Sequence, residues 1–185
     1  MTISRDEAAK AIHLMERTQA RAFDARVYRN AGAQLILWGA IWALAYTLSG
    51  LWPHRLGLIW PPMVLTGVLA GFFLMRRARA ASGLDPKFGL RWAVQAAAIA
   101  LFIYATYLVF PITSPAQALT FPVLLLAFIY ALIGSARFAR LLWIGAALFV
   151  LAVGGFVFLK PYIAFWLAAV GGGGLVAGGL WLRGA

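Results

Sequence analysis

The residue types that most often carry chemistry are scarce in this chain and poorly placed for it. The sequence has five acids and no cysteine, and the acids fall within the first 30 residues or at Asp85 in a polar loop. The two histidines, His13 and His54, lie on either side of an apolar run long enough to cross a membrane. Proton relays need ionisable groups at membrane depth, and nucleophilic sites need a base within hydrogen-bond reach. We therefore expect no enzymatic activity, no metal site and no cofactor.

Four aromatic residues could form a binding pocket. Trp42 and Tyr46 fall in the first apolar stretch and Tyr104 and Tyr107 in the third, all toward the outer side of the membrane in the orientation derived below. Tyrosine combines an apolar body with a polar tip, which suits a small amphipathic ligand. The alternative is ordinary core packing and anchoring at the membrane interface.

Glycines at four-residue spacing are candidate helix-packing residues. Gly67 and Gly71 in the second apolar stretch, and Gly174 and Gly178 in the sixth, match the spacing of small residues that lets membrane helices approach closely. Such contacts can join helices within one chain, or form the seam of an oligomer or of a complex with another membrane protein. The run Gly171–Gly174 could also act as a hinge in the middle of its stretch.

The composition indicates that these residues are positioned by helices in lipid. Of 185 residues, 64% are hydrophobic and 11% are charged, with a mean hydropathy of +0.87, against about 45–50% and about 25% in soluble domains. We predict that Pro122 lies in the first turn of the fourth apolar stretch and that Pro161 opens the sixth, positions where a missing N–H costs little. We predict an all-α polytopic transmembrane bundle in residues 31–185, with six spans at about 31–50, 56–75, 92–110, 116–135, 141–159 and 161–182.

The first 30 residues form a separate polar segment. Ser4 followed by Glu7 fits a capping box, which predicts a helix from that point. Apolar residues recur on one side of this helix and charged residues on the other. The apolar side carries Ile12, Met15 and Phe23. We expect residues 1–30 to form an amphipathic cytoplasmic helix that lies on the membrane surface or docks on the bundle, before the chain turns into the first span.

Basic residues predict the orientation. Of the 16 Lys and Arg residues, all except Arg55 and Lys160 flank the apolar stretches on the side of the N-terminus. Short loops rich in Lys and Arg stay in the cytoplasm, so both termini are expected there. Arg outnumbers Lys, and Ala and Gly are abundant, which indicates a bacterial source and hence the inner membrane. These loops account for the net charge of +11, so we expect the lipid bilayer as a partner and no nucleic acid.

The six stretches read as three hairpins, each with a proline at the outer turn and an arginine on the return. The third hairpin, from Leu142-Trp143-Ile144-Gly145 through Lys160-Pro161 to Gly178-Gly179-Leu180, resembles the hairpins of HdeD-like bacterial membrane proteins. The first, with Leu37-Trp38-Gly39-Ala40-Ile41-Trp42, is similar to small bacterial membrane proteins of unknown function. The HdeD-like resemblance implies six spans and a role in acid resistance.

Two functions from different classes stay open at this point. The first is a small, non-enzymatic inner-membrane protein that acts through a partner or a second copy, or in envelope-stress physiology. The second is a transporter, or a membrane substrate-binding subunit, for a small neutral or apolar molecule held by the outer aromatic residues. A continuous cavity that opens outward would favour the second function, and a filled bundle the first.

Overall fold

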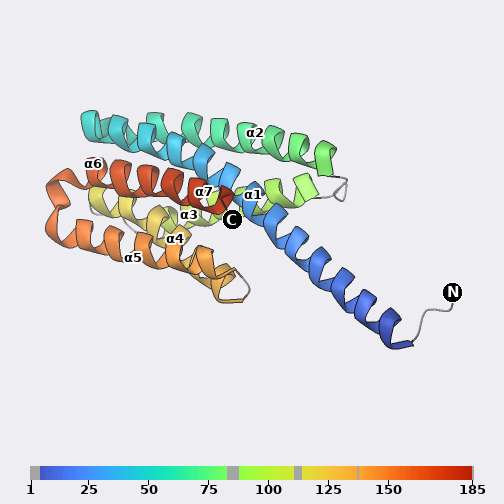
Figure 1. Ribbon diagram of the computed structural model, residues 1–185. Helices are drawn as coiled ribbons and strands as arrows, with labels where there is room; N and C mark the ends of the chain where they lie inside the picture. The colour runs from blue at the N-terminus through green and yellow to red at the C-terminus, as the bar shows by residue number, and fades with distance from the viewer. Residues whose placement is uncertain (1–4, 83–87, 111–113, 137, 185) are drawn as a thin grey trace.

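The computed structural model is a bundle of antiparallel helices (Figure 1) and describes residues 5–82, 88–110, 114–136 and 138–184, without the side chains at 5–12, 20–21, 23–24, 26, 79–82 and 88–93. All regular structure in these ranges is helical, which confirms the all-α prediction. The elements are α1 (Arg5–Leu51), η1 (Pro53–Arg55), α2 (Leu56–Ser82), α3 (Phe88–Val109), α4 (Pro115–Ala136), α5 (Ala139–Phe158), η2 (Lys160–Tyr162), α6 (Ile163–Leu167), η3 (Ala168–Gly173) and α7 (Gly174–Arg183).

The helices are long enough to cross a membrane. Five segments of the described residues qualify by length and composition, namely Val27–Leu51, Pro53–Ala78, Pro115–Ala136, Ala139–Phe158 and Lys160–Arg183. The third predicted span corresponds to α3, whose described apolar part, Val94–Val109, is shorter. α3 as a whole has 22 residues, about 33 Å at 1.5 Å per residue, against about 30 Å of hydrocarbon. The chain is therefore a multi-pass membrane protein.

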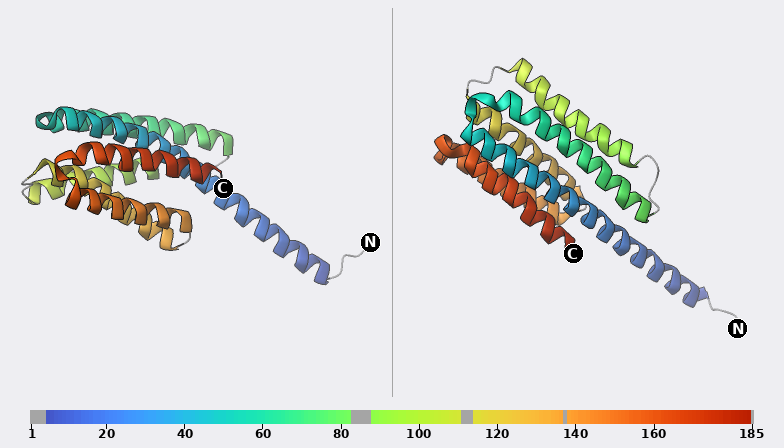
Figure 2. Two further views of the ribbon diagram at one scale, coloured as in Figure 1. Left: turned by 60° about the vertical axis from the view of Figure 1, so that its left-hand side comes forward. Right: turned by 90° about the horizontal axis from the view of Figure 1, so that it is seen from above.

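α1 is the helix around which the bundle is assembled. Its membrane-spanning part contacts α2 on one side and α6, η3 and α7 on the other, while α4 and α5 form a closely packed hairpin. Figure 2 shows the helices running alongside one another, with α3 at the edge of the bundle next to α2. The last span, Lys160–Arg183, comprises η2, α6, η3 and α7. The core lies between α1, α4, α5 and this last span, and includes the buried side chains Leu35, Val123, Leu148, Leu167 and Leu175.

The N-terminal segment is helical, as predicted, but the predicted turn before the first span is wrong. α1 continues as one helix of 47 residues, roughly 70 Å long, and its first part projects beyond the bundle (Figure 1). Leu14 and Met15 in this part are 71% and 61% exposed, so the described side chains do not dock on the bundle. The reason is local: no glycine or proline interrupts residues 5–31, where Ala, Arg, Gln and Glu favour helix.

Part of the prediction for this segment falls outside the described residues. Ser4 of the capping box precedes the described chain, and the side chains of Glu7, Ile12 and Phe23 are among those not described. Contact of the projecting helix with lipid headgroups therefore stays a prediction.

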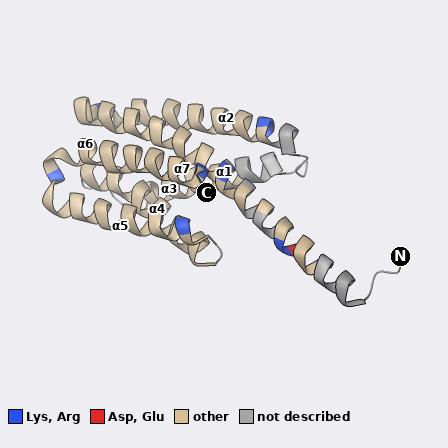
Figure 3. Cartoon of the chain, viewed as in Figure 1, with Lys and Arg blue, Asp and Glu red and all other residues tan. Residues whose placement is uncertain are grey.

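The charged residues of the bundle lie at its ends, outside its apolar middle (Figure 3). Arg55 of η1 and Lys160 of η2 lie at one end. Arg76 of α2, Arg140 of α5 and Arg183 of α7 lie at the opposite end. α1 projects from this second end (Figure 1), so the basic side chains and the N-terminal helix occupy the same side.

Candidate functional site

Two of the aromatic residues predicted to line a pocket fill the space between helices instead. Tyr46 is completely buried and Trp42 is 8% exposed, and their rings meet edge to face with centroids 5.7 Å apart. Trp60 of α2 also meets the Tyr46 ring edge to face, at 4.9 Å. The Tyr46 hydroxyl donates a hydrogen bond of 2.9 Å to the Leu119 carbonyl of α4. Tyr46 is therefore a core residue that joins α1, α2 and α4.

Tyr107 of α3 supports α4 because a proline leaves a carbonyl of that helix without its usual donor. Pro122 lies inside α4, past the first turn where it was predicted, and it has no N–H to offer the Ala118 carbonyl four residues earlier. The Tyr107 hydroxyl donates to this carbonyl at 2.5 Å, and the Tyr107 ring lies 5.8 Å from Phe121. In lipid every backbone polar group must find a partner inside the protein. Tyr104, one turn earlier, is 62% exposed and takes no part in this contact.

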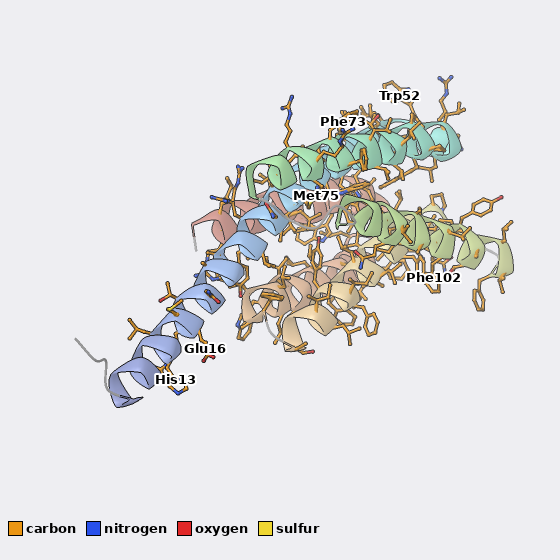
Figure 4. The ribbon with its side chains drawn as sticks, turned by 90° about the vertical axis from the view of Figure 1, so that its right-hand side faces the viewer. His13, Glu16, Trp52, Phe73, Met75 and Phe102 are labelled. Carbon is orange, nitrogen blue, oxygen red and sulfur yellow. The ribbon has the colours of Figure 1, made fainter. Side chains whose placement is uncertain are left out.

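The four aromatic residues are divided between the core and the surface, since Trp42 and Tyr46 are buried and Tyr104 is exposed. Two open hollows of the described molecule include none of the four. One lies on the projecting part of α1. The other lies between α3 and α4, beside Phe102 (labelled in Figure 4), and its remaining lining residues are Ala98, Ile99, Leu125 and Ile129. The side chains of Trp42 and Tyr46 therefore fill space in which the second functional interpretation expected a pocket.

The two candidate glycines of α2 lie against α1. A methyl group added at Gly67 would come within 2.6 Å of the Trp38 ring. Gly71 is buried, and its carbonyl accepts a hydrogen bond of 3.0 Å from the Gln34 side-chain amide. Both positions therefore allow α2 to approach α1 closely.

In the last span the close contact falls on other glycines than the predicted pair. A methyl group at Gly178 would lie 3.1 Å from the Ile144 side chain, which is tight but involves a movable group. A methyl group at Gly174 would lie 4.0 Å from Leu148, an ordinary van der Waals distance. Gly174 is therefore not a point of close approach between helices.

The closest approach is an antiparallel seam between α1 and the last span. A methyl group at Gly172 would come within 2.5 Å of the Ala43 backbone nitrogen. One at Gly179 would come within 2.6 Å of the Gly32 carbonyl, and one at Gly39 within 2.7 Å of the Gly172 carbonyl. These contacts involve backbone atoms that cannot move aside. We call Gly32, Gly39, Gly172 and Gly179 the glycine seam.

The glycines of the seam follow a seven-residue spacing in the sequence, and not the four-residue spacing of the predicted packing residues. Gly32 and Gly39 are seven residues apart, and so are Gly172 and Gly179. Seven residues make nearly two helical turns, so each pair lies on one side of its helix. Small residues at this spacing on two antiparallel helices allow the backbones to touch at two levels.

The middle of the last span is π-helical. η3 covers Ala168–Gly173, and the Gly174 N–H points toward the Ala169 carbonyl five residues earlier as well as toward nearer carbonyls. A methyl group at Gly173 would meet nothing within 4 Å, and one at Gly171 would approach Trp42 only to 3.7 Å. Packing therefore explains Gly172 of this run but not Gly171, Gly173 or Gly174.

Gln34 is a buried polar residue that the sequence reading missed. It is 7% exposed, and its amide nitrogen bonds to Gly71. Its side-chain oxygen, Oε1, is buried with no hydrogen-bond partner. Gln34 interrupts the apolar residues of the first predicted span. A polar side chain at such a position indicates a contact inside the bundle, and the sequence could have revealed it in this way.

The projecting part of α1 presents two different sides. Leu14, Met15, Thr18 and Gln19 line an open, mostly apolar hollow along one side. On another side His13 and Glu16 lie 3.4 Å apart and are both largely exposed, as Figure 4 shows. The described residues contain no group of three or more His, Asp or Glu side chains that could hold a metal ion.

Comparison with known proteins adds no relative to this description. The chain matches no protein-family model, no curated protein and no solved structure.

Proposed function

We propose that the protein is a non-enzymatic membrane adaptor, which holds the first part of α1 outside the bilayer as a docking helix for a partner protein. The observation that carries this proposal is the continuity of α1. One helix of 47 residues provides both the central span of the bundle and the projecting segment. A partner bound to the projecting segment is thereby joined rigidly to the membrane domain.

The exposed side chains of the projecting segment support this proposal. Leu14 and Met15 are large apolar residues that are 71% and 61% exposed, and they lie where the helix has left the bundle. Helical stability in proteins comes mainly from packing of an apolar side, and an isolated helix in water is marginal. A partner helix laid along Leu14, Met15 and Thr18 would supply this packing. The burial of Trp42 and Tyr46, two of the expected pocket residues, favours an adaptor over a transporter.

Site-specific photocrosslinking tests the docking helix. We expect a benzophenone amino acid at Met15 to crosslink to a protein partner in intact cells. The matched control is the same amino acid at His13, which is two residues away and therefore on nearly the opposite side of α1. Crosslinks from both positions, or from neither, would contradict a docking side. Co-expression of two differently tagged copies distinguishes a second copy of the chain from another protein.

The proposal includes an orientation, with both termini in the cytoplasm of a bacterium and the chain in its inner membrane. The excess of Arg and Lys at the end from which α1 projects supports it. Reporter fusions after Ser82 and at the C-terminus should behave as cytoplasmic, and a fusion at His54 as external. A C-terminus on the external side would overturn this orientation.

The π-helical segment favours one second candidate, a binding or transport subunit for a small neutral or apolar molecule. Irregular helices at mid-membrane often mark binding sites, and packing does not require Gly171 or Gly173. The chain has no cysteine, so Gly173→Cys would introduce a single thiol. Labelling of this thiol by a membrane-impermeant maleimide would favour the second candidate. We expect no labelling at Gly173, and labelling in the control variant His54→Cys.

A further inference from the structure

The side-chain amide of Gln34 is bonded at its nitrogen and unbonded at its oxygen. The side chain is 7% exposed, and its Nε2 atom donates a hydrogen bond of 3.0 Å from α1 to the Gly71 carbonyl of α2. Its Oε1 atom is also buried, and no donor reaches it among the residues that the structure describes. A buried amide oxygen without a donor is costly, above all in lipid, where no solvent replaces the lost bond. A bound molecule that donates a hydrogen bond to Oε1 would remove this cost.

The register of α1 against α2 shows where such a molecule would lie. Gln34 meets Gly71, and Trp38, one turn further along α1, meets Gly67. A methyl group added at Gly67 would lie 2.6 Å from the Trp38 ring, so this ring already fills the space between the helices at its own level. In the other direction, one turn before Gln34, the next polar side chain on this side of α1 is Asn30, which is half-buried.

Asn30 is placed to hold the same molecule as Gln34. Residues four apart in a helix lie one above the other, with Cβ atoms about 5–6 Å apart. Helical side chains lean toward the N-terminus of their helix, so the Gln34 amide leans toward Asn30. A single water molecule that makes two hydrogen bonds of about 2.8 Å spans a gap of this size. The Asn30 amide offers an acceptor oxygen and two N–H donors, so it can bond to such a water in either direction.

We propose that Gln34 and Asn30 bind a single buried water molecule between α1 and α2. Oε1 can only accept hydrogen bonds, so its occupant must be a donor, and a metal cation would need about six or more oxygen ligands. Water is the smallest donor and needs two to four polar partners. Gln34 follows Val27, the first residue of the span, by seven residues, about 10 Å, so water has a short path from the end at which α1 projects.

The bound water gives Gln34 a definite role in the bundle. Without a donor at Oε1, the buried amide costs free energy that its one bond to Gly71 offsets only in part. With the water in place, both halves of the amide are bonded, and Gln34 becomes a stabilising link between α1 and α2. This proposal is independent of the docking helix.

Magnetisation transfer from water, measured by NMR, tests the site in the full chain. In phospholipid nanodiscs, with glutamine labelled by 15N, we expect a water cross peak at the Gln34 side-chain amide, assigned by its loss in Gln34→Met. Gln19, which is exposed on the projecting part of α1, is the positive control. Asn30→Leu should weaken the Gln34 cross peak at least about fivefold, the factor that corresponds to one net hydrogen bond.

The matched control for Asn30→Leu is Ala40→Leu, which adds the same side chain at an exposed position of α1. It should leave the water cross peak of Gln34 unchanged. An unchanged cross peak in Asn30→Leu would show that Asn30 does not hold the water and would overturn the bridge. A missing cross peak at Gln34, in a sample where Gln19 shows one, would overturn the site as a whole.

Thermal stability gives a second, independent measurement. Methionine is similar in size to glutamine and has no amide. If Oε1 had no donor, Gln34→Met would remove a costly group, and the melting temperature would stay the same or rise. We expect it to fall by about 2–4 °C, the shift for one net hydrogen bond in a chain of this size, because the bond to Gly71 and the water are both lost. An unchanged or raised melting temperature would contradict the bound water.

Discussion

The two sides of the bundle around α1 are packed in different ways. The last span lies against α1 through the glycine seam, and 44% of its apolar 18-residue stretch is buried inside the bundle. On the other side of α1, only 17% of the corresponding stretch of the α2 span is buried, although α2 also contacts α1. The comparison shows that hydrophobicity does not distinguish the two sides, since both consist of apolar helices.

The difference arises from the size of the residues that face α1. In lipid there is no hydrophobic force between helices, so association depends on close packing and on hydrogen bonds. Gly172 and Gly179 let two backbones touch, whereas α2 approaches α1 mainly at Gly67 and Gly71 and directs Leu58 and Leu65 outward, 74% and 59% exposed. The last span is therefore fixed by backbone contacts, and α2 by fewer and softer ones.

Gly172→Leu should have the largest effect on stability. Its side chain would have to displace the backbone of α1 at Ala43, 2.5 Å from the first added atom. We expect a loss of about 3 kcal/mol or more in the free energy of unfolding, at or above the usual cost of overpacking. Unfolding titrations in mixed micelles measure it.

The control for this variant is Gly154→Leu in α5, where an added methyl group meets nothing within 4 Å. Leucine favours helix over glycine by somewhat less than 1 kcal/mol, so this variant should be as stable as the unmodified chain or slightly more stable. If both variants unfolded alike, Gly172 would not be a point of close approach between the last span and α1.

Gly67→Leu should be less costly, because α2 has more freedom to move. The added side chain meets the Trp38 ring at 2.6 Å, and that ring is a side chain that can shift. We expect a loss of about 1–2 kcal/mol, measured in the same titration. Gly57→Leu on the same helix, with nothing within 4 Å, should show no loss. A cost at Gly67 equal to that at Gly172 would mean that α2 is as rigidly placed as the last span.

Tyr107→Phe should have the smallest effect of the three variants. It removes the donor to the Ala118 carbonyl, which Pro122 leaves without an N–H. We expect a loss of about 1 kcal/mol, the order found for single hydrogen bonds inside membranes. Tyr104→Phe is the control and should be neutral, since that ring is 62% exposed. A neutral Tyr107→Phe would show that another group already serves the carbonyl.

The all-α class and the positions of the spans could be predicted because lipid permits few alternatives. A chain in hydrocarbon must satisfy its backbone within helices, so apolar runs predict helices directly. The stretch predicted at 116–135 appears as α4 (Pro115–Ala136), and the one at 141–159 appears as α5 (Ala139–Phe158). Among the described elements, two differ in character from those expected: α1, in which a polar segment and a span share one helix, and the last span, whose middle is π-helical.

The contacts between helices could not be predicted in the same way, since they depend on which helices become neighbours. Four-residue glycine spacing pointed to Gly174, whereas the partner helix selects Gly172 and Gly179 through its own Gly32 and Gly39. Tyr46 and Tyr107 were read as pocket residues because nothing in their own stretches shows that α4 supplies carbonyl acceptors. A search for matching spacings on pairs of stretches would have found the glycine seam.

η3 also determines which changes of chain length the last span can tolerate. A π-turn closes on the fifth residue back, so it holds about one residue more than an α-turn. A one-codon deletion at Gly173 would convert η3 to a regular α-helix and leave Gly179 facing Gly32. A one-codon deletion at Ala177 would instead rotate Gly179 by about 100° away from α1. The π-helical segment is therefore the place in this span where one residue can be lost while Gly179 keeps its position against Gly32.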